Sequence, residues 1–125
     1  MAQKKNYSYS IEGSTAGKIK EINERYDLTI GDIAGVLDVT SKTVSRWTRQ
    51  KNPGFISTQK SDSLHILESI LELGRKVLGS DEELNLWLHS TVLSLEGKKP
   101  VDLIKTESGR RKVEEALHQI EYGIY

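Results

Sequence analysis

The chain has 125 residues, no cysteine, and equal numbers of acidic and basic residues. This length fits one domain or two small ones, and the missing cysteine excludes disulfides, thiolate metal ligands and a cysteine nucleophile. The sequence has no apolar run long enough for a membrane span and no N-terminal signal pattern, so we expect a cytoplasmic location.

The zero net charge conceals a difference between the two halves of the chain. Residues 1–60 contain ten Lys or Arg and six Asp or Glu, whereas residues 61–125 contain eight and twelve. Such asymmetry is typical of a protein whose basic half meets an anion and whose acidic half meets another partner. A basic half is also compatible with an ordinary solvated surface, so a motif is needed before the charge indicates a function.

Apolar residues recur at helical spacing along the chain, and no segment alternates as a strand would. Residues 14–27 place Ile19, Ile22 and Tyr26 on one face, with Ser14 as the expected N-cap. The longest periodic segment runs from about Thr58 to residue 78. Later helix boundaries are marked by a glycine stop, hydroxyl caps and a proline start: Gly79, Ser80, Pro100 and Thr106.

The predicted fold is therefore all-α, with about seven helices. The turn signal at residues 52–54, Asn-Pro-Gly, indicates a boundary between an N-terminal domain, residues 1–57, and a C-terminal domain, residues 58–125. The apolar face of the helix expected at 58–78 is wide, which suggests a contact between two copies of the chain.

Residues 28–51 carry the strongest motif. Thr29 is expected to cap a short helix, a tight turn follows at residues 38–40, and Ser41 is expected to cap a second helix. The apolar positions are those that two helices must bury when they cross steeply over a short turn: Ile33, Ala34, Leu37, Val39, Val44 and Trp47. This pattern resembles the helix-turn-helix of Xre/Cro-type repressors, although Asp38 stands where that family favours glycine.

The outward side chains of the second helix are hydrogen-bond donors or cations, which suits the major groove of DNA. Arg46 or Gln50 would reach base edges, while Lys42, Arg49 and Lys51 would meet phosphates. The predicted DNA-binding set comprises Thr40, Ser41, Lys42, Thr43, Ser45, Arg46, Arg49, Gln50 and Lys51. The alternative is a solvated basic helix that binds no DNA; Trp47 is assigned to the core rather than to base stacking.

Catalytic and metal-binding patterns are missing from the sequence. The three histidines are 24 and 29 residues apart and have no metal-ligand spacing. The acidic run at residues 81–83 is better explained as the first turn of a helix, where carboxylates suit the helix dipole. We therefore expect no enzyme, no cofactor and no metal.

The C-terminal half carries a second pattern, made of Leu86-Trp87-Leu88, Leu95-Glu96-Gly97, Pro100, Leu103-Ile104, Thr106, Gly109, Val113, Leu117, Ile120 and Tyr122-Gly123. With these positions it resembles the C-terminal domain of the Xre/MbcA/ParS antitoxins. The usual pattern has a second glycine before the proline, where this chain has Glu96-Gly97. The resemblance implies a partner toxin with a RES domain that degrades NAD, repression of the chain's own operon through operator DNA, and a C-terminal end placed at the toxin's active site.

The chain ends on an apolar and aromatic segment, and ordinary termini are polar and frayed. A left-handed Gly123 after the last helix would turn Ile124 and Tyr125 away from the helix axis. The predicted toxin-binding set is Glu121, Tyr122, Gly123, Ile124 and Tyr125. The ring of Tyr122 could instead pack on Leu117 or His118.

The sequence is compatible with two functions. The first is a toxin-neutralising antitoxin that also represses transcription, as a homodimer within a larger complex with its toxin. The second is a stand-alone phage-type repressor whose C-terminal half only dimerises it.

Overall fold

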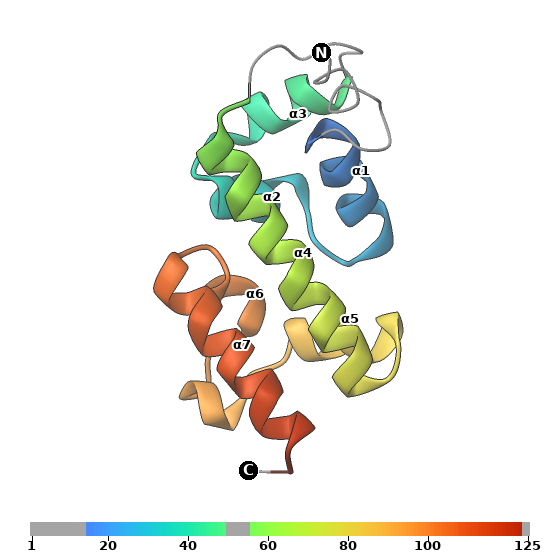
Figure 1. Cartoon of the computed structure of the whole chain (residues 1–125), viewed down its shortest axis with the longest axis vertical. Coiled ribbons are helices and arrows are strands. Elements are labelled where there is room, and N and C mark those ends of the chain that lie inside the picture. The colour runs from blue at the N-terminus through green and yellow to red at the C-terminus, as the bar shows by residue number, and fades with distance from the viewer. Residues whose placement is uncertain (1–14, 50–55, 124–125) are drawn as a thin grey trace, which may run out of the picture. The chain divides into compact units, whose positions relative to one another are not determined.

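The computed structural model describes residues 15–49 and 56–123. These residues form seven α-helices and one 3₁₀ turn, with a single isolated bridge between Val92 and Lys98, which confirms the predicted all-α fold (Figure 1). The chain divides into two compact units, Met1–Leu64 and His65–Tyr125. Helix α4 (Thr58–Leu78) gives its first turns to the N-terminal unit and the rest to the C-terminal unit, and the domain limits of 1–57 and 58–125 stay a prediction.

The N-terminal unit contains α1 (Thr15–Arg25), α2 (Ile30–Leu37) and α3 (Ser41–Arg49), which pack against one another in all three pairs. The predicted inward positions within these helices are buried, and Trp47 is only 6% exposed. The core assignment of Trp47 is therefore confirmed. Val39, in the turn between α2 and α3, was predicted to be buried and is half-buried. Among residues 15–49 and 56–64, the buried apolar residues are Ile19, Ile22, Tyr26, Leu28, Ile33, Ala34, Val36, Leu37, Val44, Trp47 and Leu64.

Helix α2 begins and ends with well-formed caps. The Thr29 hydroxyl accepts from the Asp32 N–H, and the Asp32 carboxylate accepts from the Thr29 N–H, so the predicted cap is a full capping box. At the other end Asp38 adopts the left-handed conformation, with φ 57°. Val39 N–H donates to the Ala34 carbonyl, which closes the turn as a glycine would.

The predicted cap of the next helix was wrong by one residue. Ser41 is the first residue of α3, and the residue before it, Thr40, accepts from the Thr43 N–H at 3.1 Å. The hydroxyl of either Thr40 or Ser41 is chemically able to cap α3, so the geometry of the preceding turn decides which residue is the cap. Three residues are enough to reverse the chain between Leu37 and Ser41, and they leave Thr40 as the last non-helical residue. The predicted cap Ser14 and the predicted turn at 52–54 lie outside the described residues.

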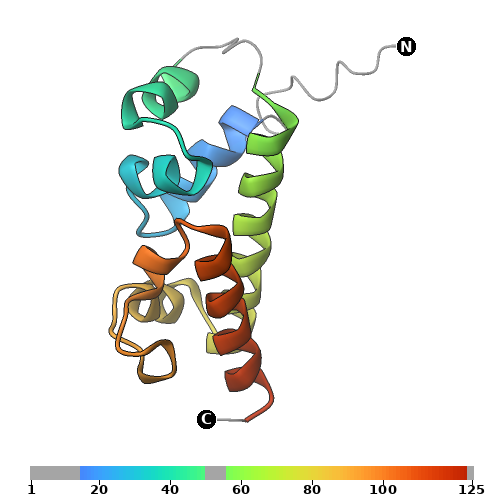
Figure 2. The same cartoon turned by 90° about the vertical axis from the view of Figure 1, so that its left-hand side faces the viewer.

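The C-terminal unit consists of the rest of α4, α5 (Asp81–Leu88), η2 (Leu93–Leu95), α6 (Pro100–Leu103) and α7 (Glu107–Glu121). Helix α7 runs beside the C-terminal part of α4 (Figure 2). The predicted apolar faces are buried except at their edges, where Val77, Leu78, Trp87 and Ile120 are half-buried. The buried apolar residues are Leu67, Ile70, Leu71, Leu84, Leu88, Leu95, Val101, Ile104, Val113, Ala116 and Leu117.

The predicted helix boundaries of this unit are confirmed. Gly79 ends α4 with φ 105°, and the Ser80 hydroxyl accepts from the Glu83 N–H at the start of α5. Pro100 is the first residue of α6. Thr106 caps α7 by accepting from the Gly109 N–H at 3.0 Å. Among the described residues, no helix is long and apolar enough to cross a membrane.

Arg110 is an unusual buried charge at the start of α7. Its side chain is 7% exposed, and its Nη1 donates to the Ile104 carbonyl at 2.9 Å. Burial lowers the pKa of the Arg110 guanidinium from its ordinary value, and the carboxylate of Glu107 opposes that shift. This hydrogen bond links α7 to the turn that follows α6. It also gives a partner to the carbonyl group of Ile104, which stands at the C-terminal end of α6.

Candidate functional site

The first candidate surface is the outward face of α3. Lys42, Arg46 and Arg49 are exposed, as are Thr40 and Ser41, while Thr43 and Ser45 are half-buried. The cations therefore lie on the face opposite to Val44 and Trp47, which are buried in the unit's core. Gln50 and Lys51, also predicted to bind DNA, lie outside the described residues.

Two of the predicted hydroxyl groups are already engaged at the N-terminus of α3. The hydroxyls of Thr40 and Thr43 are 3.0 Å apart, and Thr40 also accepts from the Thr43 N–H. These groups stabilise the start of the helix. Within residues 15–49 and 56–123 the guanidinium groups of Arg46 and Arg49 have no such bond. They are therefore the side chains of this face best suited to an external anion or base.

A residue that the sequence did not reveal supports the turn between α2 and α3. Lys60, in the first turn of α4, donates through Nζ to the Asp38 carbonyl at 3.3 Å. The Thr15 and Ser61 hydroxyls form a second link between α1 and α4, at 3.0 Å. These partners are 22 and 46 residues apart in sequence, so no local pattern could indicate them.

The second candidate surface is the C-terminal end of α7. The helix ends at Glu121, Tyr122 N–H donates to the His118 carbonyl, and Gly123 N–H donates to the Ile120 carbonyl. Gly123 has φ 72°, so the predicted left-handed turn after the last helix is confirmed. The Tyr122 side chain is 69% exposed. Ile124 and Tyr125 lie outside the described residues.

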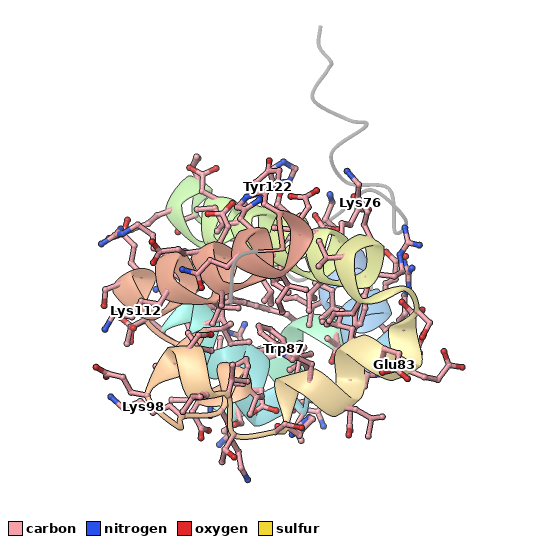
Figure 3. The ribbon with its side chains drawn as sticks, turned by 90° about the horizontal axis from the view of Figure 1, so that it is seen from below. Lys76, Glu83, Trp87, Lys98, Lys112 and Tyr122 are labelled. Carbon is pink, nitrogen blue, oxygen red and sulfur yellow. The ribbon has the colours of Figure 1, made fainter. Side chains whose placement is uncertain are left out.

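The side chains at this end of α7 are bonded to one another and to α4. His118 and Tyr122 stack with their ring centroids 6.0 Å apart and their planes at 11°. His118 Nδ1 is 3.0 Å from Glu121 Oε1, and Lys76 Nζ is 3.7 Å from Glu121 Oε2. Lys76 and Tyr122 lie at the same edge of the unit, whereas Trp87 points toward its centre (Figure 3). Helical spacing could have indicated the contacts of His118, but Lys76 carries no sequence signal for its contact.

The turn between α5 and α6 exposes a leucine that the sequence reasoning missed. Val92 N–H donates to the Lys98 carbonyl, and consecutive residues Glu96 and Gly97 both have positive φ, at 60° and 76°. This hydrogen-bonded turn holds Leu93 outward with 91% of its surface exposed. Glu96 thus adopts the conformation for which glycine is usual. Its carboxylate is 3.9 Å from Lys98 Nζ.

Metal binding and catalysis have little support in the described part of the chain. Within residues 15–49 and 56–123, no three His, Asp or Glu side chains are grouped so as to hold a metal ion. One groove of about 190 Å³ lies between the η2 turn and α7. Its lining combines cations and carboxylates, including Lys98, Lys112 and Glu115, with the apolar Leu95 and Leu103, and contains no histidine or other nucleophile paired with a base.

Comparison with known proteins relates part of this chain to a known family. Residues 73–123 match the family described as the antitoxin Xre/MbcA/ParS C-terminal toxin-binding domain. The chain is 29% identical over 84 residues to the mycobacterial cidal antitoxin MbcA of Mycobacterium tuberculosis and of Mycobacterium bovis, which covers 66% of this chain and 70% of theirs.

A solved structure shares the fold. The chain matches a chain of the crystal structure of the M. tuberculosis MbcT–MbcA toxin–antitoxin complex with a TM-score of 0.64 and 25% sequence identity. The match covers 88% of this chain and 96% of that chain. The protein is thus an all-helical antitoxin of a toxin–antitoxin system. Residues 73–123, the part matched by the family model, are similar to the toxin-binding domain of the Xre/MbcA/ParS antitoxins.

Proposed function

We propose that this antitoxin neutralises a RES-domain, NAD-degrading toxin by placing residues 121–125 at the toxin's active site. The observation that carries the proposal is the end of α7, where an exposed Tyr122 precedes a left-handed Gly123. Both residues lie in the segment matched to the toxin-binding domain of the family. The MbcA relative is found in complex with a toxin, MbcT, which supports a toxin partner for this chain.

The residue types at positions 121–125 suit the active site of a toxin that degrades NAD. A site that consumes NAD must bind an aromatic base and a pyrophosphate, so it offers an apolar slot next to cationic groups. The ring of Tyr122 or Tyr125 can occupy that apolar slot. The antitoxin itself has no catalytic role in this proposal.

We also propose that the outward face of α3 binds operator DNA, so that the protein regulates its own operon from the cytoplasm. The support is the exposed row of Lys42, Arg46 and Arg49 on a short helix that follows a three-residue turn, the arrangement of a helix-turn-helix. Two copies in a homodimer would read half-sites about one DNA turn, roughly 34 Å, apart. Gln50 and Lys51 complete the predicted DNA-binding set.

The proposed neutralisation of the toxin is tested by deleting Ile124 and Tyr125. The shortened antitoxin is co-expressed with the untagged toxin, and the NAD turnover of the purified complex is compared with that of the full-length complex. We expect NAD turnover to rise while operator binding and the melting temperature stay unchanged. If the toxin in the complex with the shortened antitoxin remains fully inhibited, inhibition arises from another surface of the antitoxin. The proposed role of residues 121–125 is then wrong. If the co-expressed toxin co-purifies with neither form, the proposed RES-domain partner is wrong.

A further inference from the structure

The carboxylate of Glu121 is already occupied within the antitoxin. Its Oε1 is 3.0 Å from His118 Nδ1, and its Oε2 is 3.7 Å from Lys76 Nζ. The Glu121 side chain is only 23% exposed, whereas those of Lys76 and His118 are 75% and 44% exposed. A carboxylate held in this way is poorly placed to leave and meet cations of a partner protein.

Helix stability does not account for a glutamate at this position. A negative charge at the C-terminus of a helix interacts unfavourably with the helix dipole, so Glu121 alone would weaken the last turn of α7. The ammonium group of Lys76 offsets that charge from the neighbouring helix α4. Partly exposed ion pairs of this kind contribute little to the free energy of folding.

The contacts continue from Glu121 to the residue just before Gly123. The His118 ring that faces Glu121 also stacks on the ring of Tyr122. Lys76, Glu121, His118 and Tyr122 therefore form one connected set, which we call the tail clamp. The ring that stacks on Tyr122 thus contacts the same carboxylate that pairs with Lys76, and Tyr122 directly precedes the positive φ of Gly123.

We propose that the tail clamp pre-organises the chain end for entry into the toxin, with Lys76 and His118 as positioning residues that do not touch the toxin. This inference rests on the proposed function of residues 121–125. It changes the part played by Glu121, from a group that contacts the toxin to one that directs the chain. A partner binds a pre-organised segment more tightly because less of its conformational freedom is lost on binding.

The test compares three single variants, with the antitoxin concentration that halves NAD turnover by the purified toxin as the readout. Lys76→Glu replaces the attraction to Glu121 with repulsion, and we expect it to raise that concentration about three- to tenfold. Lys76→Arg keeps the ion pair and should behave as the unaltered antitoxin. Arg111→Glu is the matched control, because Arg111 pairs with Glu107 at 3.8 Å, is similarly exposed, lies at the other end of α7 and changes the net charge equally.

A second measurement follows the clamp in the free antitoxin. Nuclear Overhauser contacts between the His118 and Tyr122 rings should be present in the unaltered protein and in Arg111→Glu, and reduced in Lys76→Glu. All four proteins should melt at the same temperature within about 2 °C, since the pairs are largely exposed. Ring contacts that persist unchanged in Lys76→Glu would contradict the clamp.

Deleting Ile124 and Tyr125 separates this inference from the proposed function. If the deletion alone leaves inhibition unchanged, the proposed function fails. If the deletion releases the toxin but Lys76→Glu inhibits normally, only the clamp fails. In the shortened chain Lys76→Glu should have no further effect; an equal loss in both backgrounds would mean that Lys76 contacts the toxin directly, which also overturns the clamp.

Discussion

Gly109, in the first turn of α7, lies directly against the carbonyl group of Leu103, at the end of α6. A Cβ atom at position 109 would overlap that carbonyl oxygen and would come within 2.8 Å of the Thr106 hydroxyl. Both neighbours are fixed, because the Thr106 hydroxyl accepts from the Gly109 N–H and Thr106 N–H donates to the Leu103 carbonyl. The close approach of α7 to the preceding turn therefore requires glycine.

Replacing Gly109 with alanine should destabilise the C-terminal unit by about 2–3 kcal/mol, because backbone atoms cannot move aside as a side chain can. Urea unfolding followed by circular dichroism measures this change. Ser108→Ala is the control, since Ser108 is exposed on the same helical turn and should change stability by less than about 0.5 kcal/mol. Equal midpoints for the two variants would show that the α6–α7 turn can open without cost.

The capping box of α2 gives a prediction for the N-terminal unit. Thr29→Ala removes the acceptor of the Asp32 N–H and should cost about 1 kcal/mol of unfolding free energy. Thr58→Ala, at the exposed first residue of α4, is a matched control with the same loss of atoms. The prediction is wrong if thermal melts of the two variants coincide.

The exposed arginine at position 46 should distinguish operator from unrelated DNA. Arg46→Ala should weaken operator binding by about 1–3 kcal/mol if its guanidinium reads a guanine, and should leave binding to unrelated DNA nearly unchanged. Lys42→Ala should instead weaken binding to both DNAs alike and reduce the salt dependence by about one unit. Fluorescence anisotropy with both DNAs at several salt concentrations measures these effects. Unchanged operator affinity in a folded Arg46→Ala protein would remove Arg46 as a reader.

The positive φ of Gly123 gives a prediction for the chain end. Gly123→Val should weaken toxin inhibition about five- to thirtyfold, because a β-branched residue resists the left-handed conformation by about 1–2 kcal/mol. Gly123→Asn should inhibit almost normally, since asparagine tolerates this conformation. A Cβ atom at this position would meet no atom within 4 Å among the described residues, so both variants have room for their first side-chain atom. The measurement is NAD turnover by the toxin against antitoxin concentration, and equal inhibition by both variants would exclude a requirement for the turn.

The order of the helices and most of their boundaries could be predicted from the sequence. Helical periodicity, hydroxyl caps and glycine stops act within a few residues of the chain, so Thr29, Ser80, Thr106 and Gly79 are identifiable without a structure. The left-handed Gly123 follows from the same local chemistry. The cap of α3 was misplaced because Thr40 and Ser41 are adjacent and equally suitable, and only the geometry of the turn selects Thr40.

Contacts between residues distant in sequence were decided by the tertiary structure alone. Lys60 supports the carbonyl of Asp38, and Lys76 offsets the charge of Glu121, although neither lysine differs in sequence from an ordinary solvated cation. The close approach of Gly109 to Leu103 likewise depends on how α6 and α7 pack. Local chemistry fixes where a helix starts and stops, whereas the partner of a long, flexible side chain is set by which elements the buried apolar faces bring together.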